Sequence, residues 1–191
     1  MTSTYFSNPL IFLIDTVFAL YILAVFLRFL LQWSNADFYN PISQFLVRIT
    51  HPPLRGLRRF IPSVGRIDSA SLVLLLALQM LSDFSILLLK GLSVGLAALF
   101  LLSFSQLLEL LFNIFIFAIF ARAILSWLNP GALGSVDSLL YYLTEPVLAV
   151  CRKLIPDLGG VDLSPLVALI ALQVAKMIFL PPLQQLASLL S

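Results

Sequence analysis

The chain contains one segment twice, and this repetition limits its possible folds more than any other feature does. Adding 94 to each residue number aligns residues 15–79 with residues 109–173 without a gap, and 23 of the 65 aligned positions are identical. Self-similarity at a fixed period indicates copies of one structural unit. The sequence therefore predicts a tandem duplication, with repeat one in residues 1–94 and repeat two in residues 95–191.

The identical positions include a motif of Arg, Trp, Thr, Pro, Gly and Asp at fixed spacing. Its members in repeat one are Arg28, Trp33, Thr50, Pro52, Arg58, Pro62, Gly65 and Asp68. Its members in repeat two are Arg122, Trp127, Thr144, Pro146, Arg152, Pro156, Gly159 and Asp162. Because Pro and Gly favour turns and Asp favours the start of a helix, each motif predicts a polar segment that ends at a new helix. Asp68 and Asp162 are the expected N-caps.

The composition is that of a membrane protein. Hydrophobic residues make up 61% of the chain and charged residues 10%, whereas soluble domains carry about 25% charge. Apolar runs of roughly 20 residues, enough to cross a bilayer as a helix, occur four times. The expected spans are residues 9–31, 70–90, 103–125 and 164–184, and the proline pair at 181–182 is expected to end the last one. Residues 91–102 are also apolar, and they predict either a junction between repeats or an extension of the third span.

The polar segments between paired spans contain amphipathic patterns. Ile42, Phe45, Leu46 and Ile49 follow the spacing of a helix with one apolar face. Residues 50–53 are expected to break this helix because of their prolines, and a second short helix is expected after them. Basic helices in the plane of a membrane surface bind anionic lipid head groups. The residues assigned to that contact are Arg55, Arg58, Arg59, Arg152 and Lys153.

The distribution of Lys and Arg predicts the orientation. Five Arg residues lie in loop 32–69, and Arg152 and Lys153 lie in loop 126–163, whereas the N-terminal tail and the tail after Lys176 have none. Basic loops stay in the cytoplasm. We therefore expect an all-α membrane protein of about four transmembrane helices in two parallel repeats. The amphipathic helices of each repeat are then cytoplasmic, and both termini lie outside.

Polar residues within the spans form a predicted layer at one depth in the outer leaflet. The members of this polar layer are Asp15, Gln79, Asp83, Glu109, Asn113, Gln173 and Lys176. Charges in hydrocarbon are costly and need partners, so we expect Lys176 to pair with Asp83. The layer is either a network that holds the helices together, a site or path for a cation, or a set of charges that reach the outer interface. Arg28 and Arg122 either extend to head groups or hold the cytoplasmic segment of their own repeat near Thr50 and Thr144.

Two residue counts argue against common chemistries. Cys151 is the single cysteine and His51 the single histidine, so the usual acid–base and metal-binding residues are nearly absent. We expect no enzymatic activity, no metal and no cofactor. The net charge of +2 gives no support to nucleic-acid binding.

The paired motifs resemble those of the YggT family of bacterial inner-membrane proteins, which has plastid relatives. Repeat two follows the pattern of the family closely around Asp162, whereas repeat one departs from it after Gly65. The resemblance implies a multi-pass inner-membrane protein with no established enzymatic activity. In an inner membrane, the termini that the charge distribution places outside are periplasmic. The resemblance also implies a link to osmotic or potassium stress, to cell division and envelope organisation, or, in plastids, to membrane-protein maturation.

Two functions follow as expectations. The first is a membrane scaffold or assembly factor that uses its cytoplasmic segments, with anionic lipids and a protein partner or a second copy of itself as partners. The second is an oligomeric cation channel or transporter, chiefly for potassium, that uses the polar layer.

Overall fold

The computed structural model describes residues 3–65, 67–128, 134–154 and 162–190, which form six α-helices. The helices are α1 (Ser3–Trp33), α2 (Pro41–Leu57), α3 (Ser69–Leu89), α4 (Leu96–Leu128), α5 (Ser135–Leu154) and α6 (Ser164–Leu189). Within these ranges the only β-type pairing is an isolated bridge between Val64 and Ile67. Four helices, α1, α3, α4 and α6, are long and apolar enough to cross a membrane. The predicted all-α membrane fold is therefore confirmed.

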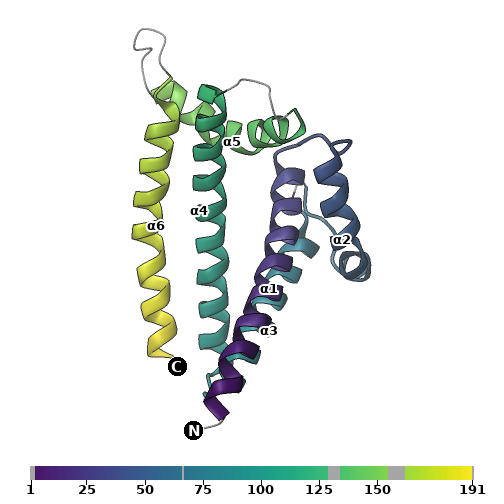
Figure 1. The fold of residues 1–191 in the computed structure, drawn as a ribbon, viewed down its shortest axis with the longest axis vertical. Helices are drawn as coiled ribbons and strands as arrows, with labels where there is room; N and C mark the ends of the chain where they lie inside the picture. The colour runs from purple at the N-terminus through teal and green to yellow at the C-terminus, as the bar shows by residue number, and fades with distance from the viewer. Residues whose placement is uncertain (1–2, 66, 129–133, 155–161, 191) are drawn as a thin grey trace.

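Each repeat has the same internal arrangement. In repeat one α1 packs against α3, and in repeat two α4 packs against α6. The amphipathic helices α2 and α5 contact both long helices of their own repeat. The repeats meet mainly where α3 packs against α4. Both termini lie at one end of the molecule, and α5 crosses the opposite end (Figure 1).

The segment between the repeats combines the two predicted alternatives. A turn follows α3, and Gly91 adopts a φ of 69° there, a left-handed conformation that glycine tolerates better than other residues do. Helix α4 then begins at Leu96, so part of the apolar segment belongs to a helix of 33 residues. The third span is consequently longer than predicted.

The prolines do not break the helices, which corrects two predictions. Helix α2 continues through Pro52 and Pro53, and α6 continues through Pro181 and Pro182 to Leu189. A helix can continue past a proline when another group satisfies the carbonyl that the proline leaves without its backbone donor. In α2 the carbonyl of Ile49, which Pro53 leaves without its usual donor, accepts a hydrogen bond of 3.3 Å from the hydroxyl group of Tyr21.

The core lies near the end of the bundle that carries α2 and α5. Ile22, Val25 and Phe26 of α1 pack with Leu54 of α2 and Leu75 of α3 in one buried cluster. A second cluster joins Ile119, Leu148, Cys151 and Ala168 of repeat two. Not all of the predicted apolar face of α2 is buried: Leu46 is, whereas Ile42 and Phe45 are exposed. The packed core therefore fixes the amphipathic helices on the long ones and leaves apolar side chains of α2 at the surface.

Candidate functional site

The motif arginines of α1 and α4 bind the motif threonines of α2 and α5. Arg28 Nη1 donates a hydrogen bond of 2.8 Å to Thr50 Oγ1, and Arg122 Nη1 donates one of 2.7 Å to Thr144 Oγ1. Each threonine hydroxyl in turn donates to a carbonyl one turn earlier in its own helix, at 2.6 Å in α2 and 2.7 Å in α5. The contacts match the alternative in which each arginine holds the amphipathic segment of its own repeat. The main acceptor is a hydroxyl group and not a backbone carbonyl.

A second motif pair joins the end of each amphipathic helix to the start of the next span. Arg58 forms a salt bridge with Asp68, which is almost fully buried and also accepts a hydrogen bond of 2.7 Å from the hydroxyl of Ser71. Burial favours the neutral carboxyl, but the hydrogen bonds from Arg58 and Ser71 outweigh it and hold the pKa of Asp68 below its usual value. Asp68 occupies the predicted N-cap position of α3.

The equivalent pair in repeat two is looser. Arg152 Nε lies 3.4 Å from Asp162 Oδ2, and the Asp162 side chain is 53% exposed. The N-cap of α6 is Leu163 and not the predicted Asp162. Asp162 lies one residue earlier, and its side chain accepts the backbone N–H of Ser164 at 2.9 Å. Hydrogen bonding from the side chain of Ser164, aided by its backbone N–H and by the neighbouring Arg152, lowers the pKa of Asp162.

Repeat two contains a carboxylate bridge that has no counterpart in repeat one. Glu145 occupies the position of His51, and its two oxygens lie 2.6 Å from Arg152 Nη1 and 3.1 Å from Arg122 Nη1. The hydrogen bond from Arg152, followed by the one from Arg122, lowers the pKa of Glu145. The same hydrogen bond, which Arg152 donates to the carboxylate, raises the pKa of Arg152. Glu145 of α5 thus binds Arg122 of α4 and also Arg152, which lies seven residues further along α5.

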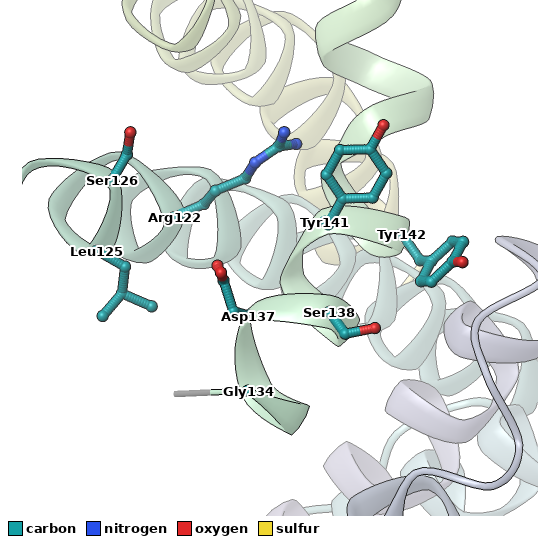
Figure 2. Close-up of a pocket in the computed structure, with 8 residues that line it drawn as sticks. All are labelled: Arg122, Leu125, Ser126, Gly134, Asp137, Ser138, Tyr141 and Tyr142. Carbon is teal, nitrogen blue, oxygen red and sulfur yellow. The ribbon is translucent and has the colours of Figure 1, made fainter. Parts of the chain in front are cut away.

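A cavity lies next to this bridge. It has a volume of about 500 Å³ and is lined by residues of α4 and α5 and by Gly134. Figure 2 shows Arg122 from α4 directed towards the ring of Tyr141, with Asp137 of α5 nearby. The guanidinium carbon of Arg122 is 4.6 Å from the centroid of that ring, within the range of a cation–π contact. The cavity therefore presents a cation that is already held by an aromatic ring and a carboxylate.

The predicted polar layer divides into two separate clusters. In the first cluster Asp83 Oδ2 accepts a hydrogen bond of 2.7 Å from Ser103 Oγ, and Gln79 bonds both Asp83 and Gln106. These residues connect α3 with α4 across the boundary between repeats. Asp83 is buried there.

The second cluster contains Lys176, and the predicted pair of Lys176 with Asp83 is wrong. Lys176 Nζ lies 2.9 Å from Glu109 Oε1 and 2.8 Å from Asn113 Oδ1. The physical reason is the order of the helices, because α6 packs against α4 of its own repeat, whereas α3 meets α4 from repeat one. Asp15 and Gln173 are exposed and join neither cluster through a hydrogen bond within the described chain.

The other predicted residues lie as follows. Arg55, Arg59 and Lys153 are exposed, as the assignment to lipid head groups requires, and Trp33 is 39% exposed at the end of α1. Pro52 and Pro146 lie inside α2 and α5. Pro62 and Gly65 lie in the connection that follows α2, where Gly65 has a φ of 61°. Pro156 and Gly159 lie outside the described residues, and only the backbone of Trp127 is described.

Two contributors were missed from the sequence. Ser103 lies in an otherwise apolar stretch, but its position three residues before Gln106 places both on one face of α4, and that spacing could have indicated it. Glu145 was compared only with His51. An acid one residue after the motif threonine could have indicated a partner for Arg122 and Arg152.

The fold and these contacts define a helical membrane protein built from two tandem repeats, each with an amphipathic helix fixed between two spans. The family model described as CCB3/YggT matches the chain twice, at residues 7–89 and 101–183. The chain belongs to the CCB3/YggT family. The offset between the two matches is the 94 residues found within the sequence itself.

Relatives from several bacteria cover most of the chain. An uncharacterized protein of Pseudomonas aeruginosa is 43% identical over 170 residues, which span 88% of this chain and 86% of the relative. A protein of Vibrio alginolyticus is 43% identical over 171 residues, which span 88% of this chain and 92% of the relative. The uncharacterized protein YggT of Escherichia coli is 36% identical over 170 residues, which span 89% of this chain and 88% of the relative. No solved structure matches the chain.

Proposed function

We propose that this protein is a non-enzymatic scaffold or assembly factor of the bacterial inner membrane. In this proposal α2 and α5 lie at the cytoplasmic surface, where they bind anionic lipids and a protein partner or a second copy of the chain. The processes that it supports are envelope organisation under osmotic stress or during cell division. The basic loops are cytoplasmic and both termini are periplasmic.

The observation that carries the proposal is the surface of α2 and its flanking turns. Its aromatic side chains face outward: Tyr39 is 87% exposed and Phe60 is 79% exposed. The exposed basic side chains of this surface are Arg48, Arg55, Arg58 and Arg59, of which Arg58 is paired with Asp68. Aromatic and Arg residues are the types that dominate binding energy at protein interfaces, and aromatic rings beside cations also suit the membrane–water interface.

The anchoring of this surface supports the same function. Arg28 and Arg58 tie α2 to α1 and to the start of α3 through Thr50 and Asp68. A binding surface is more effective when the structure holds it in one conformation before the partner arrives. The pairing of the motif residues therefore accounts for the motif without assigning it a chemical reaction.

Complementation of a strain that lacks the gene tests the scaffold. Because the exposed cations make the contacts, charge reversal at Arg55 and Arg59 should abolish growth after osmotic upshift, whereas Glu109→Gln and Asp15→Asn should leave it intact. The opposite pattern would reject the scaffold. A reporter fused after Ser191 checks orientation separately, because alkaline phosphatase should be active there and a cytoplasmic reporter should not.

An oligomeric path for cations, chiefly potassium, is the second candidate. It is favoured by the exposure of Asp15 and Gln173 on helices of membrane-spanning length, because lipid does not satisfy such side chains and a second copy could. Potassium flux through purified protein in liposomes tests it, with Glu109→Gln as the matched variant. Flux that Glu109→Gln lacks would favour the channel over the scaffold, and no flux through folded protein would reject the channel.

A further inference from the structure

We propose that repeat one contains a binding site for one phosphate group, formed by Arg28, Arg58 and His51 next to Thr50. The phosphate is that of an anionic phospholipid, so the inference rests on the proposed membrane-surface position of α2. The corresponding place in repeat two is filled by a side chain of the protein itself, the carboxylate of Glu145.

The two repeats provide the same frame around this place. The arginine–threonine distances are 2.8 Å for Arg28 and 2.7 Å for Arg122. The threonine hydroxyls bond their own helices at 2.6 and 2.7 Å. Arg58 and Arg152 each pair with the aspartate that precedes the next span. Because the surrounding contacts are alike, the difference between His51 and Glu145 is the main difference between the two places.

In repeat two the two guanidinium groups converge on Glu145. Its oxygens lie 2.6 Å from Arg152 and 3.1 Å from Arg122. With Asp162 as the second acid, two cations meet two anions, and the charge of this group of four is zero. A buried or half-buried guanidinium group needs such compensation, because removal of a charge from water is costly.

In repeat one the compensating acid is missing. His51 occupies the position of Glu145, and Asp68 is engaged by Arg58. Among the residues that the structure describes, no carboxylate lies within salt-bridge distance of Arg28. Arg28 interacts electrostatically with both Arg58 and Asp68, and it is only 7% exposed. Two cations and one anion leave a charge of +1, which a ligand with one negative charge would balance.

A phosphodiester fits this place in charge, geometry and location. It carries one negative charge, and its oxygens accept the paired N–H donors of a guanidinium group and the N–H of an imidazole. Arg28 lies five residues before the end of α1 at Trp33, which is about 7.5 Å along the helix axis. If α1 spans the bilayer, an arginine at that depth extends its side chain toward the level of the lipid phosphates. The exposed Arg55 and Arg59 add positive charge nearby.

Exchange of the two unlike residues tests the site. Wild type, His51→Glu, His51→Gln and Glu145→His are purified in neutral detergent and titrated with phosphatidylglycerol, phosphatidylethanolamine or inorganic phosphate. Native mass spectrometry counts bound lipid, and thermal unfolding reports stabilisation. His51→Glu supplies a built-in carboxylate and should weaken phosphatidylglycerol binding about tenfold or more, the scale of one charged hydrogen bond. His51→Gln adds no charge and should bind phosphatidylglycerol nearly as wild type does.

Glu145→His should create the second site, so that two phosphatidylglycerol molecules bind in place of one. His51→Glu that binds phosphatidylglycerol as wild type does, or Glu145→His that gains no lipid, would overturn the inference. Binding of inorganic phosphate without lipid would retain the phosphate site but reject the lipid source. These readouts use purified protein, so loss of the site is distinguished from failure of the scaffold in cells.

Discussion

The side-chain amide of Asn40 donates a hydrogen bond of 2.6 Å to the backbone carbonyl of Ser135. Its oxygen accepts the backbone N–H of Ile42 at 2.9 Å and so caps α2. A single buried side chain therefore starts one amphipathic helix and ties it to the first residue of the other. This link joins the two repeats at the surface to which the scaffold function is assigned.

Replacement of Asn40 should separate these two roles. Asn40→Ala removes the cap and the link to Ser135, and it should lower the free energy of unfolding by about 2 kcal/mol, one for each lost hydrogen bond. Asn40→Ser retains a capping oxygen for Ile42, but its side chain is too short to reach the Ser135 carbonyl. Its free energy of unfolding should therefore fall by about half as much. Unfolding titrations in detergent measure both values. Equal losses for Ala and Ser would show that the cap contributes nothing.

The motif threonines should differ in importance although their geometry is alike. Within the described residues, Thr50→Val leaves the buried Arg28 with only the Val47 carbonyl, at 3.5 Å, and a buried unsatisfied donor costs about 1–3 kcal/mol. Thr144→Val should cost less, because Arg122 still bonds Glu145. Comparison of the two melting temperatures checks this order. A larger loss for Thr144→Val would contradict it.

A charge exchange tests the ion pair between α4 and α6. Glu109→Lys and Lys176→Glu should each reduce the yield of folded protein, since each places two like charges together within the membrane. The double variant should recover the yield because the pair is restored. Asp83→Lys combined with Lys176→Asp is the control, and it should show no recovery because these two residues are not partners.

Acid should weaken repeat two through Glu145. Because the pKa of Glu145 is lower in the folded state than in the unfolded chain, the folded state binds fewer protons, and stability falls as the pH falls. The contribution is fully present above the ordinary Glu pKa of about 4.3 and is lost as the pH drops through the lower folded value. Melting temperatures measured across this window should fall more steeply for wild type than for Glu145→Gln. Parallel curves would exclude this role.

The contact between repeats should depend on one hydroxyl group. Ser103→Ala removes the buried donor to Asp83 and should destabilise the protein by about 1–3 kcal/mol. Ser105→Ala is the matched control, because among the residues that the structure describes the Ser105 hydroxyl bonds only the Leu102 carbonyl of its own helix, at 2.7 Å. In unfolding titrations in detergent, Ser103→Ala should have a clearly lower free energy of unfolding than Ser105→Ala. If the two variants are equally stable, the bond between Ser103 and Asp83 does not hold the repeats together.

The sequence was most informative where one short-range pattern decides the outcome. Apolar runs located the four spans, and the repeat predicted that Arg28 and Arg122 play the same part. The helix ends were predicted less well. A proline pair indicates a break only if the freed carbonyls stay unsatisfied, and the hydroxyl of Tyr21, distant in sequence, satisfies one of them in α2.

The sequence pattern could not predict which helices contact each other. The depth of Lys176 follows from its position in a span, but depth does not reveal which neighbouring helix it faces. Asp83 and Glu109 were both plausible partners on depth alone, and the order of packing selected Glu109. The aligned repeats differ at His51 and Glu145. The role of Glu145 follows from the positions of Arg122 and Arg152, which the structure provides.

The packing of α3 against α4 joins unlike faces of the repeat, as in an array that grows by adding units to one edge. Such arrays stop where the terminal units lack the joining residues. Ser103 corresponds to Pro9 on α1, and Asp83 corresponds to Met177 on α6; both counterparts are exposed. A third unit would therefore find neither the serine nor the aspartate that join α3 to α4 at the matching positions of the outer helices. A larger assembly of this chain must therefore use a different contact.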